Sequence, residues 1–323
     1  VPPSAPSTTM KSGVMPVSSI ALAMPNHSHG WPMQSLKPVG LPPERSRSRS
    51  MKRIISIGVL NAASDDTDYN KNGFIDPEDL IFKFSDGIDQ DGDGYADNIA
   101  GWDTYEDDND PFDEHQYGHG SGEARDSNAE ANNGGDVGTC PDCRIMPLRV
   151  GDSFVADVND FAQAVVFATD TGATLIQSAL GTMNNSRFAQ ESVDYAYRRG
   201  VALIASAADE SAGHHNQPSE LEHASVFNAI GAPEVPASAS GSYLQFRGCT
   251  NYGAYITASV PADSCSSEAV GRTAGMTGLA YAAARNEVAR GRLQDYGVLD
   301  GSGGVPAGHG LSAEEAKQLI VTT

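Results

Sequence analysis

The sequence predicts an α/β protein with a doubly wound, mainly parallel sheet and helices on both faces. Short runs of branched apolar residues recur along the chain without polar alternation, as expected for strands buried on both faces. Segments with helical patterning separate most of these runs. Strands and helices that alternate in this way are typical of a parallel sheet, whose functional groups gather at the carboxyl ends of the strands.

The apolar runs define the expected strands. Each is short, and most are rich in β-branched and other apolar residues. The expected strands span residues 53–60, 143–150, 173–178, 200–206, 226–232 and 254–259.

Four segments between or after these runs predict helices. They span residues 158–170, 188–199, 272–288 and 312–320. The third is rich in Ala and Gly on most of its faces, so we expect it to be buried at the centre of the domain.

The first 50 residues differ in composition from the rest. They hold half of the chain's 18 prolines, interleaved with serines and without a sustained apolar period. This composition is typical of a tail or wrapping arm. We therefore divide the chain into a Pro/Ser-rich N-terminal arm over 1–50 and one domain over 51–323.

Length and charge limit the classes of partner. The chain has 323 residues, 39% of them hydrophobic, which allows a substantial core. A net charge of −21 opposes binding to nucleic acid and to anionic membranes, because both would repel such a surface. No apolar run reaches the roughly 18 residues of a membrane span. Cationic partners, metal ions among them, fit this charge better.

Four cysteines fall in two groups, Cys140 with Cys143 and Cys249 with Cys265. The first pair has the spacing of a redox or zinc motif, but the second does not, which argues against a four-cysteine zinc site. Two local disulfides fit best, and four free thiols are the alternative. Disulfides predict a secreted or extracellular protein.

The segment from Asn61 to Glu114 holds 18 carboxylates against two lysines. Its first half has the spacing of an EF-hand-type loop, with Asp at the last position in place of the usual Glu. The expected ligands stand at the positions of such a loop that commonly supply an oxygen to calcium. They are Asp68, Asn70, Asn72, Phe74 by its carbonyl, Asp76 and Asp79.

A second run in the same segment repeats this spacing but has Ala100 at the last position. Its expected ligands are Asp89, Asp91, Asp93, Tyr95 and Asp97. Crowded carboxylates repel one another unless a cation neutralises them, and hard oxygen donors in a flexible loop suit Ca²⁺. We therefore predict a calcium-binding insertion at about 65–114. The alternative is a solvated acidic loop.

His119 lies between Gly118 and Gly120, where the acidic segment gives way to a helix-compatible stretch. The glycines allow a sharp turn, and a His at the head of a helix can present one ring nitrogen to a partner. An exposed His in a glycine turn is the alternative reading of this motif alone.

Asn61, residues 118–125 and residues 265–275 together resemble the three signature blocks of the subtilisin-like serine proteases. The first expected strand ends at Asn61, where the family has Asp-Thr-Gly. Residues 118–125 resemble the block Gly-His-Gly-Thr-x-Val-Ala-Gly. Residues 265–275 resemble Gly-Thr-Ser-x-Ala-x-Pro-x-x-Ala-Gly when aligned on Ala274 and Gly275. The resemblance covers roughly residues 53 to 320.

The resemblance implies hydrolysis of peptide bonds through an acyl-enzyme. It assigns Ser267 as the nucleophile, His119 as the general base and Asn61 as the residue that orients the imidazole. Asp209 falls at the position of the asparagine that donates to the oxyanion. Asn61 replaces an Asp, so the imidazolium loses its carboxylate partner, unless Asp65 or Asp66 takes that place.

Two main functions follow from these departures. The first is a secreted, calcium-stabilised serine endopeptidase that acts on polypeptides. The second is a catalytically impaired pseudo-protease that serves as a calcium-dependent binding or structural module for a protein ligand. A third hypothesis, an unrelated calcium-binding α/β protein, would leave Ser267 only as a helix cap. The sequence leaves the peptide specificity and the oligomeric state open.

Overall fold

The structure is a computed structural model. It describes residues 19–23, 68, 69, 71, 77–112, 118–129, 131, 132, 135–152, 157–213, 216–231, 245, 246, 248–295 and 310–322.

An eight-stranded sheet forms the centre of the described chain, in the order β2-β3-β1-β4-β5-β6-β7, with β8 paired to β6. The pairs β2–β3, β4–β5, β5–β6 and β6–β8 are parallel, whereas β1 and β7 run antiparallel to their neighbours. The strands are β1 (Ser19–Ala23), β2 (Trp102–Asp103), β3 (Arg144–Arg149), β4 (Leu175–Ser178), β5 (Ala202–Ser206), β6 (Ala224–Gly231), β7 (Gln245–Phe246) and β8 (Ala258–Pro261).

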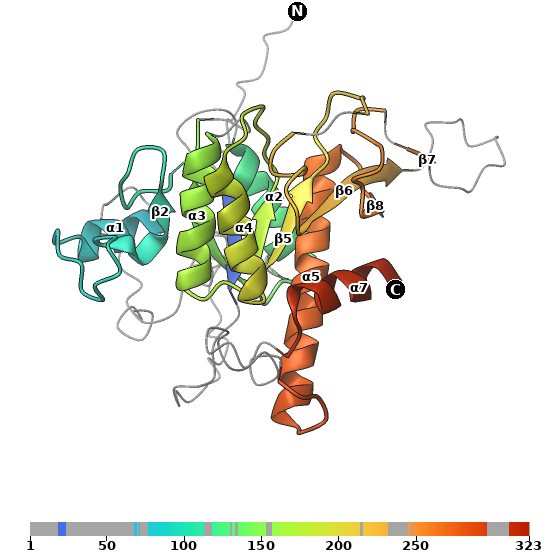
Figure 1. Cartoon of the computed structure of the whole chain (residues 1–323). Helices are drawn as coiled ribbons and strands as arrows, with labels where there is room; N and C mark the ends of the chain where they lie inside the picture. The colour runs from blue at the N-terminus through green and yellow to red at the C-terminus, as the bar shows by residue number, and fades with distance from the viewer. Residues whose placement is uncertain are drawn as a thin grey trace, which may run out of the picture.

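Helices cover both faces of this sheet. Figure 1 shows α3 and α4 lying side by side in front of the strands, with the long helix α5 beside α7. The helices are α1 (Pro77–Phe84), α2 (His119–Asn128), α3 (Val158–Asp170), α4 (Arg187–Arg198), α5 (Ser266–Ala289) and α7 (Ala313–Thr322), with a short 3-10 helix η2 (Asn98–Ala100). The predicted fold class, a doubly wound and mainly parallel α/β sheet, is confirmed.

The core has two halves, one on each face of the sheet. Along β4 and β5, Ile176 and Leu203 pack with α3 and α4, whereas Leu175 and Ile204 pack with α5. Successive side chains of a strand point to opposite faces, so a strand covered on both faces buries every residue. This burial explains why the apolar runs in the sequence show no polar alternation.

Close packing of α5 depends on its small residues. A Cβ atom on Gly275 would lie 2.6 Å from Cβ of Thr139, and one on Gly278 would lie 2.8 Å from Sγ of Cys143. Tyr281, fully buried on the same helix, donates a hydrogen bond of 2.9 Å to the carbonyl of Gly200. The expected buried position of this helix is confirmed for its first part, whereas residues 285–289 are half-buried or exposed.

A buried ion pair joins the acidic segment to the sheet. Asp103, in β2, bonds to Arg149 at the end of β3, and both side chains are almost fully buried. Arg149 also contacts Asp152 at 2.6 Å and Glu106 at 3.3 Å. Removing one partner would leave an uncompensated buried charge, so this pair fixes where the acidic segment meets the domain.

Several elements differ from the sequence predictions, and three of them have a local explanation. β1 lies within the predicted arm, in a Ser-Ile-Ala-Leu-Ala stretch too short for its pattern to predict a strand. β8 begins at Ala258 rather than 254, because a turn precedes it in which Ile256 N donates to Gly253 O. α5 begins at Ser266 rather than 272, where the carboxylate of Asp209 accepts from the first helical N–H.

The remaining domain-level expectations have different outcomes. Both predicted disulfides, Cys140–Cys143 and Cys249–Cys265, are present. The expected strand 53–60 lies outside the described residues, and the division at residue 50 stays a prediction. None of the helices in the described part of the chain combines the length with the hydropathy that a membrane span requires.

Candidate active site

His119 is the first residue of α2. Gly118 precedes it in the left-handed conformation, with φ 69° and ψ 46°, where a residue with a Cβ atom would be strained. The turn at Gly118 brings the chain into the helix and leaves the imidazole half-buried against α5. The two helices therefore meet at their first turns.

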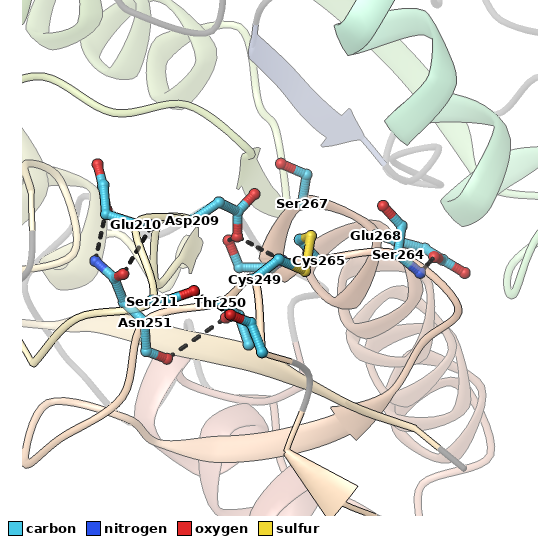
Figure 2. The surroundings of a disulfide bond; sticks show 12 residues. Asp209, Glu210, Ser211, Cys249, Thr250, Asn251, Ser264, Cys265, Ser267 and Glu268 are labelled. Atoms are coloured by element: carbon cyan, nitrogen blue, oxygen red, sulfur yellow. Dashed lines mark hydrogen bonds between the residues drawn. A yellow bond between two sulfur atoms is a disulfide. The ribbon is translucent and has the colours of Figure 1, made fainter. Parts of the chain in front are cut away.

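Ser267 lies in the first turn of α5, and its hydroxyl projects from the beginning of this helix (Figure 2). His119 Nε2 lies 3.1 Å from Ser267 Oγ. The backbone N–H groups of the first helical turn have no partner within the helix, so the N–H of Ser267 can donate to an anion beside its side chain. The structure thus brings together a hydroxyl, an imidazole and a backbone N–H at the beginning of α5.

The electrostatics of the pair favour a neutral imidazole. Burial lowers the pKa of His119, and the negative charge of Asp209 opposes this effect. A neutral imidazole with Nε2 directed at a hydroxyl can accept the hydroxyl proton.

Asp209 follows β5 and is aimed at the beginning of α5 (Figure 2). Its Oδ1 accepts from the backbone N of Ser266 at 2.9 Å and from Ser266 Oγ at 2.7 Å. A carboxylate in this place stabilises the helix N-terminus, whose free N–H groups carry partial positive charge. It also places an acceptor one residue before Ser267.

A disulfide and a hydrogen-bonded loop hold this region. Cys265, directly before Ser266, is bonded to Cys249 (Figure 2). Asn251, two residues after Cys249, makes two hydrogen bonds with Glu210. Its Nδ2 donates to Glu210 Oε2 at 2.7 Å, and its Oδ1 accepts from Glu210 N at 2.9 Å. The loop after β5 and the beginning of α5 are therefore linked both covalently and by hydrogen bonds.

Sequence reasoning missed a group of buried acids around the pair. Glu123 and Glu268 are 8% and 9% exposed. Glu268 pairs with Arg272 and accepts from Ser264 N, whereas Oε1 of Glu123 lies 3.6 Å from His119 Nε2. One feature of the sequence could have pointed to Glu123: this acidic residue stands where the signature block around His119 has Val.

Several predicted site residues lie outside the described residues. They are Asn61, Asp65, Asp66, Asn70, Asn72, Phe74 and Asp76. Of the first acidic loop, Asp68 and Asp79 are described. Asp79 is 2% exposed, and its Oδ1 accepts from Tyr69 N at 2.7 Å, which ties Tyr69 to α1.

The second acidic loop brings Asp89, Asp91 and Asp93 together. One carboxyl oxygen from each lies within 4.8 Å of the other two. Asp89 accepts backbone N–H groups of Gly92 and Gly94 at 2.7 and 2.8 Å. Partial burial and the charge of Asp93 raise the pKa of Asp91. Three hard oxygen donors that repel one another fit a calcium ion.

The other two expected ligands of this loop have different surroundings. The carboxylate of Asp97 accepts from Asp86 N at 3.0 Å and Gly87 N at 2.7 Å, and it is not one of the three converging groups. The ring of Tyr95 packs edge-on against Trp102 at 5.0 Å, which anchors the loop to the core.

A mainly parallel α/β sheet, with a His–Ser pair beside the carboxyl end of β5, defines the subtilisin-like class of proteins. The sequence profile of the Subtilase family matches residues 51–288, and the chain belongs to this family. The resemblance seen in the three signature blocks is thereby confirmed.

Two characterised relatives are similar over part of the chain. A thermophilic serine proteinase from Bacillus sp. (strain AK1) is 30% identical over 165 residues, which are 50% of this chain and 38% of that protein. Thermitase from Thermoactinomyces vulgaris is 30% identical over 196 residues, 56% of this chain and 66% of thermitase. The chain thus spans less than two thirds of the length of these relatives.

Among solved structures, that of sphericase is similar in fold. It has a TM-score of 0.50 and 19% sequence identity, over 67% of this chain and 73% of sphericase. At this identity the likeness concerns the fold alone, which agrees with the sheet and helix layers described above.

Proposed function

We propose that the protein is a secreted, calcium-stabilised serine endopeptidase that cleaves polypeptides through an acyl-enzyme on Ser267. The observation that carries this proposal is the distance of 3.1 Å between His119 Nε2 and Ser267 Oγ. Serine becomes a nucleophile when a neighbouring imidazole takes its proton, and this pair has the required geometry.

Each residue has a defined part in the proposed reaction. His119 takes the proton of Ser267 as Oγ bonds to the scissile carbonyl carbon, and then gives it to the leaving amine as the C–N bond breaks. The N–H of Ser267 donates to the oxyanion. Asp209 belongs to the same region but offers a donor only when protonated. Asn61 remains the expected partner that orients the imidazole.

Labelling with a fluorophosphonate probe tests this function directly. Wild-type protein should take up the probe on Ser267, whereas Ser267→Ala should take up none and His119→Ala should react at least about 10³-fold more slowly. Ser266→Ala is the matched control, because its hydroxyl bonds to Asp209 and not to His119. Folded wild-type protein that stays unlabelled between pH 4 and pH 9 would contradict the proposal.

A pseudo-protease is the second candidate function. Asp209, an acceptor beside Ser267, and Asn61, in place of the triad acid, both favour it. In this case the fold would serve as a calcium-dependent binding module for a protein ligand. Absence of probe labelling, together with saturable binding of a polypeptide only in calcium, would distinguish it from the enzyme.

Calcium stabilisation rests on the converging carboxyls of the second loop and on the spacing of the first. Metal-stripped protein should bind Ca²⁺ in a calorimetric titration, and its melting temperature should rise with it. Asp91→Asn should weaken binding at the second loop. Asp107→Asn is a control that removes one exposed charge of the same segment outside the cluster. Equal effects of the two variants would show that only overall charge matters.

Secretion is proposed from the two disulfides, which form and persist in oxidising compartments. The net charge of −21 continues to argue against a nucleic acid partner. Native mass spectrometry before and after reduction would test whether both disulfides are present in protein recovered from its natural compartment.

A further inference from the structure

Glu123 lies one helical turn after His119 on the same face of α2, the face that packs against α5. Its Oε1 lies 3.6 Å from His119 Nε2, the ring nitrogen that also faces Ser267 Oγ at 3.1 Å. This nitrogen therefore has a hydroxyl and a carboxyl as neighbours. Proton transfer from the hydroxyl would create a positive charge directly beside the carboxyl.

The second carboxyl oxygen of Glu123 is buried and accepts no hydrogen bond from any residue that the structure describes. A buried carboxyl that is incompletely hydrogen-bonded costs folding free energy, so stability does not explain it. Room for it comes from Gly271, where a Cβ atom would lie 3.3 Å from Oε2 and 2.9 Å from the carbonyl oxygen of Glu123. The family block has Pro at the position of Gly271.

Charged groups on α2, on α5 and after β5 act on this carboxyl. Burial is the largest cause that raises the pKa of Glu123 well above its usual value, followed by the charges of Asp126, Glu268 and Asp209. Arg125 opposes them, and Arg272 is paired with Glu268 and Asp263. Burial also lowers the pKa of His119, so the uncharged forms of the two neighbours are both favoured in the folded protein.

We propose that Glu123 is a positioning residue for His119, whose carboxylate compensates the positive charge that the imidazole acquires when it takes the proton of Ser267. This inference rests on the proposed peptidase function. Glu123 exchanges no atom with the substrate: the serine proton moves to Nε2 and then to the leaving amine. Because the carboxylate form compensates charge and the carboxylic acid does not, the reaction should accelerate as Glu123 loses its proton.

NMR titration of His119 tests this charge coupling without any need for turnover. In wild-type protein, the ring Cε1–H signal of His119, assigned with His119→Gln, should respond to two ionisations. In Glu123→Gln, which keeps the shape but not the charge, the upper inflection should disappear. Asp126→Asn, a matched carboxyl on the same helix with no contact to His119, should keep both inflections, the upper one at lower pH. An unchanged His119 titration in Glu123→Gln would overturn the proposal.

The pH profile of hydrolysis separates positioning from a merely structural role. Glu123→Gln should lower the plateau of kcat/KM on the order of tenfold or more and move its acid limb to lower pH. Glu123→Asp keeps the charge on a shorter side chain and should restore part of the plateau. A plateau and acid limb that both stay at wild-type values in Glu123→Gln would overturn the proposal. If wild-type protein takes up no fluorophosphonate, the peptidase function fails, and the NMR titration still decides the coupling.

Discussion

His119 and Ser267, 148 residues apart in the chain, face each other across the first turns of α2 and α5 with Nε2 and Oγ 3.1 Å apart. The approach depends on the close packing of these two helices, since a Cβ atom at Gly271 would lie 2.8 Å from Cβ of Asp126. The pair also depends on the loop after β5, through the contact of Asp209 with Ser266. Four predictions follow from these contacts.

The first concerns the helix contact. Gly271→Ala should destabilise the protein by about 1–3 kcal/mol, because the added methyl meets side-chain and backbone atoms that cannot both retreat. Gly122→Ala on α2 is the matched control, since a Cβ atom there has nothing within 4 Å. It should be neutral or add up to about 1 kcal/mol of stability from helix propensity. Urea unfolding of the two variants measures the difference, and equal stability would contradict the packing argument.

The second concerns the acceptor beside the nucleophile. Asp209→Asn keeps an oxygen that can accept from Ser266 N and adds an amide that can donate to an oxyanion. We expect kcat to rise on the order of tenfold to 100-fold, since one such donor typically contributes about 10²–10³. Hydrolysis of a peptide ester at neutral pH measures the change. A drop in kcat with retained fold would show that the carboxylate itself is needed.

The third concerns the disulfide before Ser266. Replacing both Cys249 and Cys265 by Ala opens a link between positions 16 apart and should cost about 3 kcal/mol. It should also slow probe labelling, because Cys265 fixes the start of the helix that carries the nucleophile.

The double Ala variant of Cys140 and Cys143 is the control for this prediction. That link joins positions only 3 apart and packs against the middle of α5, at Gly278. At a temperature where both variants are folded, labelling should slow only in the first. Equal rates would show that the Cys249–Cys265 link stabilises the fold without positioning Ser267.

The fourth concerns the dependence of stability on pH. Burial, with the charge of Glu268 next, raises the pKa of Asp126 from 3.8 to about 6 in the folded protein. The folded state therefore binds this proton more tightly than the unfolded state, so the stability it contributes is present below about pH 4 and is lost as pH rises through about 6.

Asp126→Asn removes this titration. Relative to wild type, the variant should gain on the order of 1 kcal/mol between pH 4 and pH 7, after allowance for solvent screening. Glu191→Gln, an exposed carboxylate on α4, is the control and should show no such trend. Unfolding free energies of wild type and variants across this pH range measure the effect. A constant difference between Asp126→Asn and wild type would contradict it.

The sequence by itself determined the local elements, and its resemblance to the signature blocks predicted the pairing of His119 with Ser267. Apolar runs predicted β3, β4, β5 and β6, and helical periodicity predicted α3 at residues 158–170, the bounds that the structure has. The cysteine spacing predicted both disulfides. These features depend on residues near one another in the chain, so a sequence pattern records them.

Only the tertiary structure decided which groups surround the pair. Three separate parts of the chain supply the acidic groups, which are Glu123, Asp126, Glu268 and Asp209. The start of α5 at Ser266 depends on Asp209, 57 positions earlier, which accepts the first N–H of this helix. The strand Ser19–Ala23 likewise joins the sheet only through pairing with β3 and β4. Such contacts depend on how helices and strands pack, which local periodicity does not encode. Glu123 neighbours His119 through the spacing of α2 itself, and the packing of α2 against α5 buries its carboxyl.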